Sequence, residues 1–177
     1  MANRFLIVVD MQNDFIDAAL GTPEAQAILP AAVRRIEEAR AAGETVIATL
    51  DTHGPDYMNT PEGRKLPVPH CIAGTEGWQL NPQVKAAVGD GLLVEKPTFG
   101  SVRLPEIIGE LAEDPADMTI ELIGLCTDIC VVSNTLLLKA HFPDADIRVN
   151  AACCAGVTPA KHEAALETMR SCQIDVI

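Results

Sequence analysis

Asp10, Lys96 and Cys130 carry the side chains of this sequence best suited to chemistry, and each stands at or just beyond the end of an apolar run. A cysteine thiolate attacks carbonyl carbons, and a nearby carboxylate can accept the thiol proton and later return it to a leaving amine. A lysine ammonium would hold that carboxylate in position and favour the thiolate. The three residue types together indicate hydrolysis of an amide through a covalent intermediate.

Cys130 follows the turn Leu125-Cys126-Thr127-Asp128 and falls in the first turn of a predicted helix. The first turn of a helix presents unpaired backbone N–H groups, which can lower a thiol pKa and hold an oxyanion. A buried structural cysteine is the alternative, together with a structural ion pair between Asp10 and Lys96. Three such groups at three strand ends favour the catalytic interpretation.

A possible metal site consists of Asp51, His53 and His70. Carboxylate oxygens and imidazole nitrogens suit zinc, manganese or iron. The two histidines belong to the Gly- and Pro-containing segment 52–80, and loops of that length in compact domains are usually functional or disordered. Hydrogen bonding within a polar loop is the alternative explanation for these residues.

Apolar, strand-like runs alternate with helical patterns along the chain. We predict strands over Phe5–Val9, Thr45–Leu50, Gly91–Glu95, Met118–Gly124, Ile147–Ala152 and Ile174–Ile177. We predict helices over Pro30–Ala42, Pro82–Val88, Leu104–Leu111, Ile129–His141 and Pro159–Ser171. The alternation predicts a single α/β domain over residues 1–177, with a mainly parallel sheet covered by helices on both faces. Ligands bind outside the carboxyl ends of such strands, where the candidate residues are expected to meet.

Composition narrows the classes of function. The formal net charge of -12 over 177 residues argues against binding nucleic acid or an anionic membrane through a basic surface. No apolar stretch approaches the roughly 18 residues of a membrane span, and the N-terminal apolar run is too short for a signal peptide. The six cysteines contain no C-x-x-C pair. We therefore expect free thiols in a cytoplasmic protein rather than a disulfide framework or a zinc knuckle.

The segments Val9–Phe15, Glu95–Ser101 and Gly124–Val131 resemble the isochorismatase-like cysteine hydrolases, in particular their nicotinamidase branch. The match runs in the right order along essentially the whole chain, and the G-x-x-T-D-x-C-V segment is its most distinctive part. The resemblance implies a Rossmann-like sheet of about six strands.

The resemblance also implies how the chemistry is divided among the residues. Asp10, Lys96 and Cys130 are expected to form the catalytic triad. A cis peptide bond is expected between Leu125 and Cys126. It would direct the backbone N–H groups of Cys126 and Cys130 at the oxyanion.

For the metal, the resemblance implies a divalent ion, for which zinc is expected, held by Asp51, His53 and His70. Some nicotinamidases have another histidine a few residues after the Asp-x-His pair. Residues 57–59 of this chain contain none, so no fourth protein ligand is expected. No organic cofactor is implied.

Nicotinamide is the leading substrate that the resemblance implies. Phe15 matches an aromatic residue that packs on the substrate ring, but Pro67 replaces the usual second aromatic. Trp78 or Tyr57 would have to complete the clamp. Hydrolysis of an N-carbamoyl or ureido compound on the same triad is one alternative, and a non-hydrolytic thiol or binding protein is another. The expected partners are a small amide and, in a homo-oligomer, further copies of the chain.

Overall fold

A six-stranded sheet organises the chain, whose computed structural model describes residues 3–114 and 117–177. Every strand pairs in parallel with its neighbours, and the strands lie in the order β3-β2-β1-β4-β5-β6. The strands are β1 (Arg4–Val9), β2 (Thr45–Asp51), β3 (Leu92–Lys96), β4 (Thr119–Leu125), β5 (Asp146–Ala155) and β6 (Asp175–Val176). The predicted α/β fold with a parallel sheet is confirmed.

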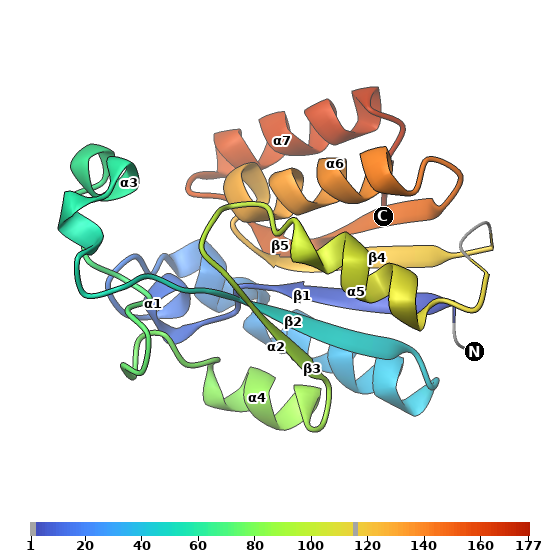
Figure 1. Cartoon of the computed structure of the whole chain (residues 1–177), viewed down its shortest axis with the longest axis horizontal. Helices are drawn as coiled ribbons and strands as arrows, with labels where there is room; N and C mark the ends of the chain where they lie inside the picture. The colour runs from blue at the N-terminus through green and yellow to red at the C-terminus, as the bar shows by residue number, and fades with distance from the viewer. Residues whose placement is uncertain (1–2, 115–116) are drawn as a thin grey trace.

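Helices cover both faces of this sheet (Figure 1). One face carries α2 (Pro23–Ala41) and α4 (Pro82–Val88), and the other carries α5 (Arg103–Leu111), α6 (Val132–His141) and α7 (Pro159–Ser171). The remaining turns are α1 (Asn13–Ile16), the 3-10 turn η1 (Tyr57–Asn59), α3 (Pro61–Lys65) and the π-helical turn η2 (Thr127–Val131), which leads into α6. None of the described helices is both long and apolar enough to cross a membrane.

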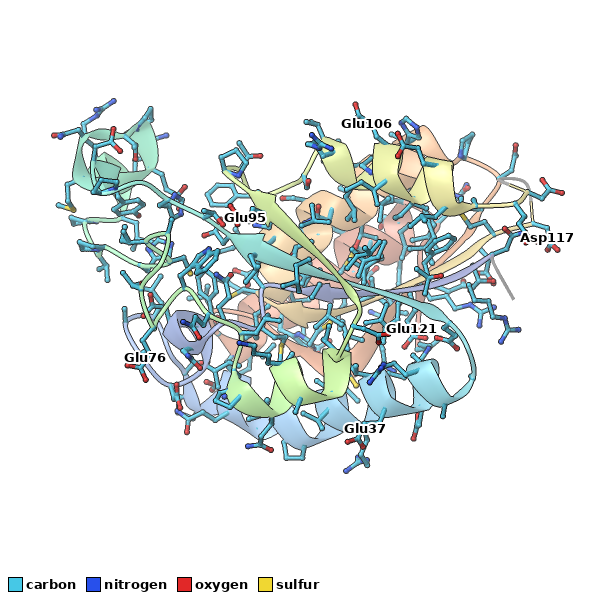
Figure 2. The ribbon with its side chains drawn as sticks, turned by 60° about the horizontal axis from the view of Figure 1, so that its bottom comes forward. Glu37, Glu76, Glu95, Glu106, Asp117 and Glu121 are labelled. Atoms are coloured by element: carbon cyan, nitrogen blue, oxygen red, sulfur yellow. The ribbon has the colours of Figure 1, made fainter. Side chains whose placement is uncertain are left out.

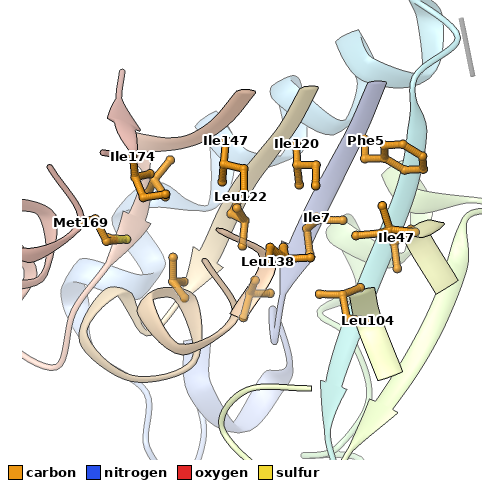
Figure 3. Packing of buried hydrophobic residues seen from close by; sticks show 14 of the residues in the cluster. Phe5, Ile7, Ile47, Leu104, Ile120, Leu122, Leu138, Ile147, Met169 and Ile174 are labelled. Carbon is orange, nitrogen blue, oxygen red and sulfur yellow. The ribbon is translucent and has the colours of Figure 1, made fainter. Parts of the chain in front are cut away.

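Strand β1 is apolar at almost every position because both of its faces are buried. Successive side chains of a strand point to opposite faces. Leu6 therefore packs in the cluster under α2 and α4, whereas Ile7 packs in the cluster under α5, α6 and α7. Figure 3 shows the second cluster, in which Ile7 and Ile120 belong to strands and Leu104 to α5. Each such buried side chain contributes about 1.5–3 kcal/mol, so the strand is held firmly up to Asp10.

Helix α2 begins seven residues before the predicted start at Pro30, and that prediction is wrong. Thr22 caps the helix, since its Oγ1 accepts a hydrogen bond from the N–H of Ala25 at 3.0 Å, and Pro23 occupies the first turn. Pro30 lies inside the helix on its exposed side. Water can there satisfy the carbonyl that the proline ring leaves unpaired, which makes an interior proline tolerable.

The strand order creates a crevice at the carboxyl ends of the central strands. From β1 the chain continues to β2 on one side, whereas β4 pairs with the other edge of β1. Ligands in open parallel sheets bind at such a switch point. The segment 52–80 extends beyond these strand ends and carries α3, which stands away from the body of the molecule in Figure 1.

Acidic residues lie both on the surface and in buried contacts, one of which joins a helix to the sheet. Glu37 and Glu106 are exposed and point outward in Figure 2. Glu121 of β4 is buried, and the Arg35 guanidinium of α2 donates to its two carboxylate oxygens at 2.9 and 2.8 Å. This two-pronged ion pair fixes α2 against the sheet.

Candidate functional site

The candidate residues meet because each lies at the carboxyl end of a different strand. Asp10 directly follows β1 in a left-handed backbone conformation, with φ of 48°. Asp51 and Lys96 are the last residues of β2 and β3, where they are direct partners in the register. Cys130 lies in the π-helical turn that follows β4. The parallel sheet thus brings four distant parts of the chain to one edge.

Lys96 lies at the centre of this group. Its ammonium nitrogen is 2.6 Å from Asp10 Oδ2 and 3.4 Å from Cys130 Sγ. It is also 3.4 Å from Asp51 Oδ1, and its side chain has no solvent exposure. Burial opposes a charged lysine, but Asp10, Cys130 and Asp51 together outweigh it and raise the pKa of Lys96. The ammonium therefore stays charged and joins the three acidic groups around it.

Burial controls the protonation of the other two side chains. It raises the pKa of the Cys130 thiol well above its ordinary value, and the Asp10 carboxylate adds to the effect. Burial likewise raises the pKa of Asp10, which the Lys96 ammonium only partly offsets. The lowered thiol pKa expected from the helix position is therefore wrong for the resting protein. In the resting protein the thiol is therefore protonated, and the Asp10 carboxyl and the Cys130 sulfur share the Lys96 ammonium as a neighbour.

A second group of side chains has the composition of a metal site. One ligand atom from each of Asp51, His53, Glu62 and His70 can be chosen so that all four lie within 4.8 Å of one another. His53 Nε2 is 3.0 Å and His70 Nε2 is 3.6 Å from Asp51 Oδ2. Two imidazoles and two carboxylates are a donor set that a divalent metal such as zinc accepts.

The surroundings of these donors favour metal binding. His70 Nδ1 lies 2.8 Å from the carbonyl oxygen of Val68, so a neutral ring that donates its proton there would present the lone pair of Nε2 to a metal. Burial alone would raise the pKa of Asp51, but hydrogen bonds with the two histidines and the charge of Lys96 lower it. Asp51 is therefore ionised, as a metal ligand must be.

Glu62 is a fourth candidate donor, which the sequence did not lead us to expect. It is in the first turn of α3, whose N-cap Thr60 accepts a hydrogen bond from Gly63 N at 3.0 Å. A Cβ on Gly63 would come within 2.0 Å of the Tyr57 carbonyl oxygen, so glycine lets α3 fold back on η1. The Thr-Pro-Glu-Gly sequence signals the start of a helix. It does not reveal that this helix turns toward His53.

A cavity of about 290 Å³ opens beside Cys130. Its lining consists of Phe15, Leu20, Thr22, Asp51, Glu62, Leu66, His70, Phe99, Cys126, Ile129, Cys130, Val157 and Lys161. Nearly all its walls away from the metal donors are apolar, and its size suits a small ligand rather than a polymer.

Of the two predicted substrate contacts, the structure brings only Phe15 to this cavity. Trp78 is not among the lining residues, and its indole N–H donates to Thr52 Oγ1 at 2.9 Å instead. The predicted contact of Trp78 with substrate therefore has no support from the cavity lining and stays a prediction. Leu66 lines the cavity next to Pro67, and Phe99 provides an aromatic wall that the sequence reasoning missed.

The peptide bond between Leu125 and Cys126 is cis, as predicted. Cys126 and Cys130 both line the cavity. Burial raises the pKa of the Cys126 thiol to about 12, so this second sulfur stays protonated and is a poor nucleophile.

Comparisons with known proteins agree with this arrangement. The family model described as "Isochorismatase domain" matches residues 4–177. The nicotinamidase/pyrazinamidase of Mycobacterium tuberculosis is 27% identical, with 98% of each chain covered. The nicotinamidase of Escherichia coli is 31% identical over 74% of each chain.

Solved structures give the same result in three dimensions. The nicotinamidase/pyrazinamidase of Bacillus subtilis has a TM-score of 0.84 at 27% identity, with 98% of each chain covered. The pyrazinamidase of Pyrococcus horikoshii, solved in complex with zinc, has a TM-score of 0.81 at 25% identity over 99% of this chain and 98% of its own. The N-carbamoylsarcosine amidase of Thermoplasma acidophilum has a TM-score of 0.79 at 28% identity, over 98% of this chain and 95% of its own. The chain therefore belongs to the isochorismatase family, among hydrolases similar to the nicotinamidases.

Proposed function

We propose that this protein hydrolyses a small amide through a thioester on Cys130, with nicotinamide as the leading substrate and nicotinate and ammonia as products. The observation that carries the proposal is the Lys96 ammonium, 2.6 Å from Asp10 Oδ2 and 3.4 Å from Cys130 Sγ, beside a cavity of about 290 Å³. A buried nucleophile, a proton acceptor and a cation at the wall of a small cavity are what acyl transfer requires.

The reaction begins when Asp10 takes the thiol proton and Cys130 attacks the amide carbon. The backbone N–H groups of Cys126 and Cys130 hold the oxyanion in the proposed mechanism. Asp10 then gives its proton to the departing ammonia, which leaves the acyl group on sulfur. Water enters, Asp10 accepts one of its protons, and the thioester is hydrolysed to acid and free thiol. Lys96 keeps Asp10 in place throughout and balances its charge.

Asp51, His53, Glu62 and His70 are proposed to hold a divalent metal, for which zinc is the first candidate. Such an ion supplies a Lewis acid at the wall of the cavity. Asp51 belongs to both groups, since Oδ1 contacts Lys96 and Oδ2 contacts the two histidines. The metal donors and the triad are therefore held in one rigid arrangement.

An N-carbamoyl or ureido compound is the second candidate substrate, and the cavity wall favours considering it. Leu66 lines the cavity whereas the neighbouring Pro67 does not, so residue 67 supplies no second aromatic ring to pair with Phe15. A stacked aromatic pair contributes about 0.5–1.5 kcal/mol beyond its buried area. Its loss weakens the preference for a flat ring over a smaller, non-aromatic amide.

Release of ammonia from a panel of amides tests the proposal. The panel contains nicotinamide and N-carbamoyl amino acids, each assayed with and without chelator. Cys130→Ala should reduce release to background, whereas Cys153→Ala should retain it, because Cys153 is equally buried but does not line the cavity. Comparable rates in Cys130→Ala would refute the assignment. No release by the unmodified protein from any amide would favour the non-hydrolytic binding protein.

The proposed setting is the cytoplasm, because all six cysteines are free thiols in the structure. A homo-oligomer remains a prediction. Sedimentation of the purified protein would give its mass in solution.

A further inference from the structure

Asn134, in the first turn of α6, makes three hydrogen bonds although its side chain has no solvent exposure. Its amide Nδ2 donates to the carbonyl oxygen of Cys130 at 2.8 Å and to that of Phe99 at 3.1 Å. Its Oδ1 accepts the backbone N–H of Ser101 at 2.9 Å. Two donors and one acceptor on a single planar group are what an amide provides, and a carboxylate of the same shape provides no donor.

These bonds join two segments that carry different parts of the proposed triad. Cys130 belongs to the π-helical turn, and Phe99 and Ser101 belong to the segment that follows Lys96 at the end of β3. The segment also approaches α6 closely, because a Cβ on Gly100 would come within 2.5 Å of Leu137 Cδ1. A side chain at residue 100 would require Leu137 to shift, so glycine favours this close approach.

The segment reaches the ammonium of Lys96 directly. Lys96 Nζ donates to the carbonyl oxygen of Thr98 at 3.2 Å, while the same nitrogen lies 3.4 Å from Cys130 Sγ. We propose that Asn134 is a positioning residue, which fixes the segment 97–101 against the nucleophile turn and thereby sets the separation of Lys96 and Cys130. Asn134 does not line the cavity, so it acts through the residues it holds. This inference rests on the proposed function only for its kinetic part.

Asn134→Asp is the informative substitution, because it keeps the shape of the side chain and the acceptor for Ser101. It removes both donors and directs a carboxylate at the carbonyl oxygens of Cys130 and Phe99. A displacement of about 1 Å at a reacting centre can cost roughly a hundredfold in rate. We expect kcat for ammonia release to fall at least tenfold and by more than KM changes. Asn134→Ala, which removes all three bonds without adding charge, should also lower kcat.

Thr135→Ala is the matched control. Thr135 is the next residue of α6, is equally buried, and donates from Oγ1 to the Val131 carbonyl at 2.7 Å. Its loss removes a side-chain bond to the same part of the chain without touching the segment 97–101. We expect its kcat to stay within about threefold of the unmodified protein.

A second measurement needs no substrate. The rate of alkylation of Cys130 by iodoacetamide, followed on the peptide that contains it by mass spectrometry, should fall at least tenfold in Asn134→Asp and be nearly unchanged in Thr135→Ala. Equal alkylation in all three proteins, or equal losses in Asn134→Asp and Thr135→Ala at similar Tm, would overturn the inference. If no amide releases ammonia but Cys130 is still alkylated more slowly in Asn134→Asp than in the unmodified protein, the result would count against the proposed function and not against the role of Asn134.

Discussion

Replacing Lys96 with methionine should destabilise the protein strongly, because the lysine is the buried cation of the site. Its ammonium is unexposed and lies within 3.4 Å of oxygens from both Asp10 and Asp51. Removing one member of a buried ion pair typically costs about 3–5 kcal/mol, since the remaining charge has no counterion. For a domain of this size the cost corresponds to a fall in Tm of about 6–20 °C.

The magnitude can be assigned to charge rather than to packing by a double-mutant cycle. Asp10→Asn with Lys96→Met removes both charges, so the double variant should recover at least about 1.5 kcal/mol relative to the sum of the single variants. Urea unfolding with chelator in every sample measures the free energies without a contribution from bound metal. A loss below about 1 kcal/mol in Lys96→Met, or strictly additive losses, would refute the account of Lys96 as a buried counterion.

Three further measurements address other parts of the structure. Burial opposes protonation of His70, but its hydrogen bond with Asp51 and further neighbours raise the pKa of His70 above 6.5. In the chelator-treated protein this group should therefore stabilise the fold below about pH 6.5, and the contribution should be lost as pH rises through the raised pKa. Urea unfolding at a series of pH values should show this dependence, and His70→Asn should flatten it. Glu62→Gln should lower the affinity for zinc at least about tenfold, because losing even a hydrogen-bonding partner of a metal ligand has an effect of that size. Competition with a fluorescent chelator measures this affinity, and an unchanged value would exclude Glu62 as a ligand. Gly124→Ala should lower the free energy of unfolding by about 2–5 kcal/mol, because at φ of 117° its Cβ would come within 2.1 Å of the backbone of β1. Gly109→Ala in α5, where the nearest atom outside the helix backbone is 3.7 Å away, should instead raise it by about 0.4–1 kcal/mol. Equal effects of the two substitutions would contradict the packing described.

The convergence of Asp10, Lys96 and Cys130 could be predicted because parallel strands all end at one edge of the sheet. An apolar run buried on both faces is easy to recognise, and the residue that ends it is thereby placed to within about one position. Helix α2 was less predictable. The pattern around Pro30 looked like a helix start, whereas capping by Thr22 decides where the helix begins.

Glu62, Phe99 and Asn134 could not be placed from the sequence because their roles depend on how irregular segments cross. Glu62 comes near His53 only after α3 has folded back on η1. Asn134 becomes a hydrogen-bonding partner because the segment that follows β3 lies against α6, an approach that Gly100 favours. The shift in the thiol pKa was missed for a related reason, since a position in the chain indicates the nearby helix end but not the depth of burial.

The residues that shape the cavity wall are separate from the residues that would carry out the reaction. Leu66, Phe99 and Val157 come from three separate loops, and none of them contacts the Asp10–Lys96 ion pair in the described hydrogen bonds and salt bridges. Each is partly exposed to solvent, so its replacement disturbs little of the core. Substitutions at these three positions could therefore change which amides are accepted while Asp10, Lys96 and Cys130 stay in place. The same separation lets one scaffold acquire new specificities by small steps.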